Sequence, residues 1–498
     1  MADETATKKE EKPAFLSVPA ERAAEVPATA QATLVWKGAD GAELRYTATA
    51  GHVEVRDDAG TLMGMMFALA YTVVDADGAA DPARPVTFAY NGGPGSASVP
   101  INFGGIGPKR VATDGTKHVR ADAPLEDNPA TLLRDSDLVF LDALGTGWSR
   151  LAEDADAAAI FGIDGDADAF ARAICSWLEA NGRWSSPVYL FGESYGTVRN
   201  AVLMRVLGER SVHLTGVVML SALFDLAQIL PGSDTYYLGM MPTFAAAAQF
   251  FGKAGAGVDE DAWFDRAMAW TEDVYAPALL RGDRLGDERE RAVAEELSTF
   301  IGLPADYILE HRLRVGLGDF RSELLRAEKR VCGRFDMRFT SDTPSPVQDS
   351  SFMHGEDASD DAVCPPWVMA LRTFCTNTLG YHGPAVYLDG NYEKVNKSWN
   401  WRHQEPGTGW PADTPNVAVD IATALRRNPT CKLAIIGGRF DAATTYWNVV
   451  HDMSRQFLSP ELKERIRWYR YGCGHMAYVD VPTLHAMGAD LHAFYEMR

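Results

Sequence analysis

The sequence predicts an α/β protein with a mostly parallel central sheet, helices on both faces and an inserted, mostly helical cap. Three observations support this prediction. Short apolar runs recur along the chain and several end in glycine-rich turns, which is typical of buried parallel strands. A helical pattern separates two of these runs, as in a βαβ unit. Between about 225 and 385, apolar residues instead recur at helical spacing, which indicates an insertion.

The N-terminal part divides into a polar segment and a group of short strands. Residues 1–30 are rich in Ala, Pro and Glu, and we expect a flexible tail there. Residues 32–74 contain short alternating runs separated by Gly/Asp turns. Such alternation predicts antiparallel strands at one edge of the sheet.

The buried strands follow in order. We expect them at 86–90, 137–142, 188–191, 216–220, 432–436 and 466–471. A helix between the second and third of these carries Phe170, Ile174 and Trp177 on one face and ends at Gly182,. The chain therefore divides into the tail 1–30, a first core segment 31–224, the cap 225–385 and a second core segment 386–498.

Charge and composition narrow the range of partners. Lys and Arg number 47 against 68 Asp and Glu, a net charge of −21, which disfavours binding to nucleic acid or to an anionic membrane. No apolar run approaches the ~20 residues of a membrane span. The first residues lack the apolar stretch of a signal peptide,, so we expect a cytoplasmic protein. The oligomeric state is left open.

Neither disulfides nor metal sites are expected. The 6 cysteines are sparse and none forms a C-x-x-C pair, which favours free thiols. No Cys/His cluster has zinc spacing. Asp164, Asp166 and Asp168 begin like a calcium loop, but the pattern fails at Ala169 and Cys175,. We expect these carboxylates to cap the following helix, and we expect no cofactor.

The motif that carries the most chemistry is Gly-Glu-Ser-Tyr-Gly at 192–196. It follows the apolar run 188–191 and precedes a helical pattern at 198–207, with Gly208 placed as its cap,. Strand, G-x-S-x-G and helix form the nucleophile elbow of an α/β-hydrolase, in which the serine projects from the end of the sheet. Ser194 is therefore the candidate nucleophile.

A serine nucleophile needs a base and a group that orients the base. In α/β-hydrolases these follow the serine in the order acid, then histidine. Asp441 lies just after the strand 432–436, and His475 just after 466–471, where open α/β sheets place their sites. We expect His475 to exchange the proton and Asp441 to orient the imidazole.

An oxyanion hole needs backbone N–H donors. One donor is the residue after the nucleophile, Tyr195. The other is expected in the turn after an early strand, and Asn-Gly-Gly-Pro-Gly at 91–95 is that turn. Gly93 is its natural donor.

These blocks together resemble the serine carboxypeptidases, α/β-hydrolases that remove the C-terminal residue of peptides. The resemblance extends over roughly residues 86–482. The blocks are N-G-G-P-G at 91–95, Gly107-Pro108, F-L-D at 140–142 with G-T-G-W-S at 145–149, G-E-S-Y-G at 192–196, Asp441, and G-H-M at 474–476.

The resemblance implies how a peptide would be bound. Members of the family recognise the α-carboxylate of the substrate with residues that correspond to Asn91, Gly92 and Glu193. The glutamate is protonated in the complex, because two carboxylates in contact share one proton. The implied function is a serine-type carboxypeptidase acting through an acyl-serine, with a peptide as substrate.

The chain also departs from the family pattern. Gly105 stands where the family has a second glutamate, and Arg439 replaces the first Asp of its G-D-x-D. The usual cysteine after N-G-G-P-G is absent, as expected for a bacterial-type member without a disulfide-rich cap. The lost acid favours an alternative function, a serine esterase or acyltransferase on the same three residues. A non-catalytic binding protein of the same fold is the third reading.

Overall fold

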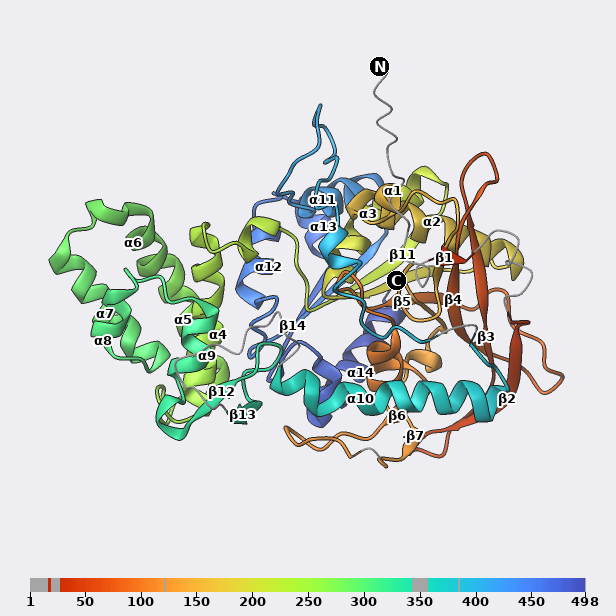
Figure 1. The fold of residues 1–498 in the computed structure, drawn as a ribbon, viewed down its shortest axis with the longest axis horizontal. Helices are drawn as coiled ribbons and strands as arrows, with labels where there is room; N and C mark the ends of the chain where they lie inside the picture. Colours follow the sequence, from red (N-terminus) through yellow and green to blue (C-terminus); the bar gives the residue numbers. More distant parts are fainter. Residues whose placement is uncertain (1–16, 19–26, 121, 343–356, 384–385, 498) are drawn as a thin grey trace, which may run out of the picture.

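A computed structural model describes residues 17–18, 27–120, 122–342, 357–383 and 386–497 (Figure 1). Within these residues the main sheet has 11 strands. They are β1 (Ser17–Val18), β2 (Ala30–Lys37), β3 (Glu43–Arg56), β4 (Leu62–Val73), β5 (Val86–Tyr90), β8 (Asp137–Leu141), β9 (Arg150–Ala152), β10 (Val188–Glu193), β11 (Leu214–Leu220), β14 (Lys432–Gly438) and β15 (Ile466–Tyr471). Most of the tail expected over residues 1–30 lies outside the described residues.

The sheet is parallel through its centre and antiparallel at one edge. Strands β8, β5, β10, β11, β14 and β15 lie side by side, and each neighbouring pair is parallel. β3 pairs antiparallel with both β2 and β4, and β4 also pairs antiparallel with β8 and β9. The predicted α/β fold with antiparallel strands at its edge is confirmed.

Both faces of the sheet are covered by helices. Along β10, Val188 and Leu190 join one apolar cluster while Tyr189 and Phe191 join the other, because successive side chains of a strand point to opposite faces. The first cluster includes α2 (Ile163–Ala180), α3 (Tyr195–Glu209), α11 (Ala418–Arg427) and α12 (Tyr446–Ser454). The second includes α10 (Ala358–Thr373) and α14 (Val481–Glu496), below the sheet in Figure 1. Short helices α1 (Ala157–Ile160) and α13 (Pro460–Lys463) lie between strands in the chain.

A third apolar cluster forms the lobe at the left of Figure 1. Its helices are α4 (Asp234–Phe250), α5 (Glu260–Trp270), α6 (Ala276–Arg281), α7 (Asp287–Ile301), α8 (Ala305–Glu310) and α9 (Leu317–Glu323). The hairpin β12 (Arg330–Cys332) and β13 (Thr340–Asp342) follows. α10 lies within the range 225–385, yet Trp367 and Leu371 pack in the second sheet cluster instead. A smaller hairpin, β6 (Lys109–Val111) and β7 (Leu125–Asp127), lies outside the main sheet.

Two local predictions are wrong. Gly208 does not cap its helix, because α3 runs on to Glu209 and its C-cap is Arg210. The Asp164 run does not cap α2 either, since the N-cap is Gly162 and no side chain makes the capping bond. The aspartates instead pair with basic side chains from other elements.

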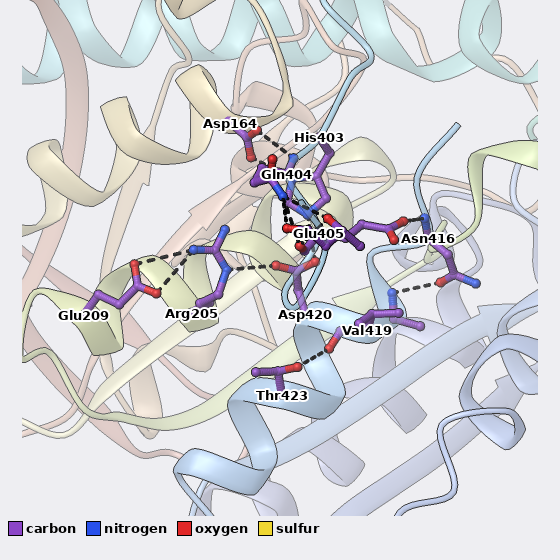
Figure 2. A network of polar contacts seen from close by, with 12 residues as sticks. Asp164, Arg205, Glu209, His403, Gln404, Glu405, Asn416, Val419, Asp420 and Thr423 are labelled. Carbon is purple, nitrogen blue, oxygen red and sulfur yellow. Dashed lines mark hydrogen bonds and ion pairs between the residues drawn. The ribbon is translucent and has the colours of Figure 1, made fainter. Parts of the chain in front are cut away.

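Asp164 belongs to a polar network around the buried side chains of His403 and Asp420 (Figure 2). His403 contacts Asp164 through Nδ1 at 2.6 Å and Asp420 through Nε2 at 2.8 Å. Arg205 donates to the same Asp420 at 3.1 Å and also forms an ion pair with Glu209. The network joins α2, α3 and α11 to the loop that carries His403.

Other expectations from composition concern thiols, metals and membranes. All 6 cysteines are free. Across the described ranges, no set of three or more His, Cys, Asp or Glu side chains is grouped for a metal ion. In the same residues we find no helix whose length and apolar character would allow it to cross a membrane.

Candidate active site

The elbow around Ser194 has the backbone that the motif predicts. β10 ends at Glu193 and α3 begins at Tyr195, so that Ser194 alone makes the turn, with φ 59° and ψ −128°. A positive φ is strained for a residue with a Cβ, and such strain persists only where surrounding structure enforces it. A Cβ on Gly192 would lie 2.3 Å from the Gly196 carbonyl oxygen, so the turn needs glycine there. Ser194 is half-buried.

Asp441 and His475 meet at the carboxyl ends of β14 and β15. The imidazole Nδ1 lies 2.8 Å from Asp441 Oδ2. The other oxygen, Oδ1, accepts the backbone N–H groups of Ala443 at 2.8 Å and Thr444 at 3.0 Å. The carboxylate is thus held in one orientation, and the bond at Nδ1 leaves Nε2 as the nitrogen available for base chemistry.

The electrostatics around His475 favour its protonated form. Burial lowers the pKa of the imidazole, but the charge and hydrogen bond of Asp441 outweigh it, and the pKa is raised above 6.5. The nearby Glu193 acts in the same direction and Arg334 in the opposite one. A base that gains a proton readily suits general acid–base chemistry.

Residues at the end of β11 form hydrogen bonds with the elbow, the histidine loop and the turn that carries Asp441. The N–H of Ser194 donates to the Leu220 carbonyl at 3.0 Å. The next residue, Ser221, donates its hydroxyl to the His475 carbonyl at 2.6 Å, and its own carbonyl accepts the Thr444 hydroxyl at 2.8 Å. Residues 220–221 therefore hold the elbow, the histidine loop and the Asp441 turn against one another.

A segment between β12 and β13 also holds the acid and the base. The Phe335 carbonyl accepts the His475 N–H at 2.6 Å, and the Arg334 carbonyl accepts the Ala442 N–H at 3.1 Å. The Phe335 ring centroid lies 5.1 Å from that of the imidazole. We did not predict these residues, because nothing in their local sequence marks a contact with loops more than 100 positions away.

The glycine turn lies against the elbow. A Cβ on Gly92 would lie 2.4 Å from the Tyr195 nitrogen, so only glycine allows this approach. Tyr195 is the first residue of α3, and the first N–H groups of a helix have no acceptor inside it. Gly93 follows with φ 106°. The two N–H groups predicted for an oxyanion hole thus come from adjoining segments, and Arg199 supports the turn by donating to the Asn91 carbonyl at 2.9 Å.

Glu193 and Asn91 are both buried beside the elbow. Glu193 is 2% exposed and Asn91 6%, and such deep burial is unusual for a carboxyl group. Burial raises the pKa of Glu193 to about 7, although the charge of His475 and hydrogen bonds from Tyr478 and Asn91 act to lower it. The Ile101 N–H donates to Asn91 Oδ1 at 3.1 Å, which leaves the amide N–H₂ of Asn91 as the donor on this side.

Tyr478 is the main residue of the site that sequence reasoning missed. Its hydroxyl donates to Glu193 Oε2 at 2.9 Å. Its ring lies over Gly105, where a Cβ would come within 3.1 Å of it. The only signal in the sequence was its position three residues after His475.

Arg439, the departure from the family's G-D-x-D, points to the cap. It donates to Glu260 at 2.7 Å and also pairs with Asp261, both at the start of α5. Arg470 of β15 pairs with Asp261 at 3.2 Å. The cap is therefore tied by charge to the strands that carry Asp441 and His475.

Comparison with known proteins agrees with the resemblance read from the motifs. Residues 40–232 match the model of the family described as serine carboxypeptidase. No curated protein matches the chain. The resemblance is thereby confirmed over residues 40–232, and it supports a peptidase activity in general terms.

Solved structures share the fold at low identity. Kex1(delta)p, a prohormone-processing carboxypeptidase from Saccharomyces cerevisiae, aligns with a TM-score of 0.54 and 14% identity, over 90% of this chain and 91% of that one. A proline iminopeptidase from Mycobacterium smegmatis aligns with a TM-score of 0.36 and 14% identity, over 90% and 98%. At such identities the first likeness establishes an α/β-hydrolase fold.

Proposed function

We propose that this chain is a serine-type carboxypeptidase that releases C-terminal residues from peptides through an acyl-Ser194 intermediate. The observation that carries the proposal is Glu193, a buried carboxyl directly before the nucleophile and beside Asn91, with a pKa of about 7. A neutral carboxyl can donate a hydrogen bond to the α-carboxylate of a peptide. An ionised one would repel it.

The proposed reaction begins with attack on the scissile carbonyl carbon by Ser194 Oγ. His475 Nε2 takes the hydroxyl proton and then delivers it to the departing amine, so that the C-terminal amino acid leaves. Water, deprotonated by the same nitrogen, attacks the acyl-serine and releases the shortened peptide. Asp441, 2.8 Å from Nδ1, stabilises the imidazolium that forms in each half-reaction,.

The negative charge on the tetrahedral oxygen needs donors that are already in place. We assign this role to the N–H groups of Gly93 and Tyr195. Backbone donors cost no reorganisation when the charge develops. The tight packing of Gly92 on the Tyr195 nitrogen supports this assignment, because it brings the glycine turn against the start of α3.

The α-carboxylate would be bound by Asn91, Gly92 and protonated Glu193. Such a site selects the free C-terminus, because a peptide amide offers no anion to share the Glu193 proton. It also places the scissile bond next to Ser194, since Glu193 and Ser194 are adjacent in the chain. Exopeptidase specificity would follow from that adjacency.

The test compares an N-blocked dipeptide with the same dipeptide amidated at its C-terminus, between pH 5 and 8. We expect hydrolysis of the free acid, slow or no hydrolysis of the amide, and loss of both with Ser194→Ala. A fluorophosphonate probe should label the wild type and not the variant. Failure to label would indicate a non-catalytic binding protein of the same fold.

A serine esterase or acyltransferase is the second candidate. It is favoured by Gly105, because no second acid lies beside Glu193 from that position. An ester of the same blocked amino acid separates the two functions. Turnover of the ester with neither dipeptide cleaved would overturn the carboxypeptidase proposal.

A further inference from the structure

The Glu193 carboxyl is contacted by a phenol from the histidine loop. Tyr478 donates to Oε2 at 2.9 Å, and its side chain is fully buried. It lies in the single helical turn Ala477–Val479, directly after the segment that contains His475. The same loop therefore brings a base to one side of the elbow and a neutral donor to the carboxyl beside it.

The ring of Tyr478 packs against two adjacent glycines and a tryptophan. A Cβ on Gly105 would lie 3.1 Å from its Cδ1, and one on Gly104 would lie 2.9 Å from its Cε2. The Trp367 ring of α10 packs with its centroid 5.8 Å away. Glycine is thus needed at position 104 for the two rings to pack here, and a side chain at position 105 would crowd the Tyr478 ring. In this chain a phenol from the histidine loop, and not an acid from position 105, contacts Glu193.

Several other titratable groups act on the Glu193 carboxyl. His475 lowers its pKa by charge, and Asp441 raises it. Cys364 of α10 interacts with it as well, and burial raises the pKa of that thiol well above its ordinary value. Burial likewise raises the pKa of Tyr478 well above 10. The thiol and the phenol therefore stay protonated at working pH, and among these groups the charges that act on Glu193 are those of His475 and Asp441.

We propose that Tyr478 is the positioning residue of Glu193: its hydroxyl occupies Oε2 and so directs the acid proton to Oε1, where a substrate α-carboxylate can accept it. A neutral carboxyl carries one O–H, and an oxygen that already accepts a hydrogen bond from a phenol is the poorer site for that proton. The inference rests on the proposed function. In this arrangement Glu193 is the acid that titrates, and Tyr478 is a neutral hydrogen-bond donor in a fixed position.

The required protonation states set the pH dependence. Peptide cleavage needs neutral His475 and protonated Glu193, two groups that interact, so the two limbs of the pH profile belong to the pair. An ester without an α-carboxylate needs only neutral His475. Its kcat/KM should rise to a plateau, whereas kcat/KM for the free-acid peptide should fall again at alkaline pH.

The test is Tyr478→Phe, measured with the blocked dipeptide and the ester from pH 5 to 9. The phenol stabilises the ionised carboxyl more than the neutral one, so its loss should move the alkaline limb for the peptide up by about one pH unit. KM for the peptide at pH 6 should rise several-fold with kcat little changed, because the proton is no longer directed. Ester turnover should stay within about twofold of the wild type.

Two further variants complete the test. Glu193→Gln should remove the alkaline limb for the peptide altogether. Tyr471→Phe is the matched control, because the Tyr471 hydroxyl donates a hydrogen bond to a different carboxylate, that of Asp490 of α14, at 2.5 Å. It should leave both pH profiles unchanged.

The outcomes distinguish this inference from the function on which it rests. A wild type that turns over only the ester would overturn the proposed function and with it the role of Tyr478. A wild type that cleaves the peptide, beside a Tyr478→Phe variant with an unchanged pH profile and KM, would overturn the role of Tyr478 alone. Equal loss on ester and peptide at every pH would show that Tyr478 is merely structural.

Discussion

His403 should stabilise the fold in a strongly pH-dependent way. Its side chain is fully buried and both ring nitrogens face carboxylates, Asp164 and Asp420 (Figure 2). An imidazole can donate from both nitrogens only when it is protonated. Burial lowers the pKa of His403, but the hydrogen bonds and charges of the two aspartates outweigh it and raise the pKa from 6.5 to about 9.

The size of the effect follows from that pKa. A change from 6.5 to about 9 corresponds to about 3 kcal/mol of unfolding free energy. Because the folded-state pKa is raised, this contribution is fully present below pH 6.5 and is lost as the pH rises through about 9,. With an unfolding entropy of about 2.1 cal/mol/K per residue, the loss corresponds to about 3 °C in Tm for a chain of 498 residues,.

The assay is thermal unfolding of wild type and His403→Gln at pH 5.5 and pH 10. We expect the variant to melt about 3 °C lower at pH 5.5 and close to the wild type at pH 10. His492→Gln is the control, since His492 also pairs with an aspartate, Asp135, but its side chain is 51% exposed. Exposed pairs contribute little, so its Tm should change by less than about 1 °C. An equal deficit of His403→Gln at both pH values, or a deficit that grows with pH, would refute the reasoning.

Three other predictions concern the site and the core. Asp441→Asn should lower kcat by about 10⁴ while the protein remains folded, because the imidazole loses its orienting carboxylate. Single-turnover acylation by an ester would measure this loss, and a tenfold loss or less would contradict the proposed role of Asp441. Phe335→Ala keeps the backbone hydrogen bond to His475 but removes the ring whose centroid lies 5.1 Å from that of the imidazole. We expect the rate of fluorophosphonate labelling to fall about tenfold. An unchanged rate would show that the ring does not help to position His475. Burial, followed by the charge of Asp225, raises the pKa of Asp452 to about 8, so this carboxyl should lower wild-type stability as the pH rises from about 4 to 8. Urea unfolding at pH 5 and 9 should therefore show Asp452→Asn gaining stability relative to the wild type at the higher pH. A variant less stable than wild type at pH 9 would contradict this reasoning.

The main strands were predictable because each reports its burial locally. β5 and β15 have the predicted bounds, and β10 extends the expected run 188–191 by two residues. A strand in a parallel sheet is buried on both faces, so an apolar run between turns marks it without reference to its neighbours. The elbow was predictable for a similar reason, since its geometry depends on five consecutive residues.

Charged residues were the least predictable part. Asp164, Asp166 and Asp168 suggested helix capping, a local role, yet each pairs with a basic side chain distant in sequence: His403, Arg199 and Arg210. A carboxylate looks the same in a sequence whether its partner is water or a buried cation. Only the packing of α2 against α3 and the 400–417 loop decides which.

The sequence by itself determined the sheet, the elbow at Ser194, and the order in which Asp441 and His475 follow it, because strands, turns and motifs depend on neighbouring residues. The tertiary structure decided what surrounds them: the carbonyls of Arg334 and Phe335 on the two loops, and the phenol of Tyr478 on Glu193. Those contacts join segments from different parts of the chain. Their geometry depends on how whole elements pack, and a pattern of consecutive residues does not encode that packing.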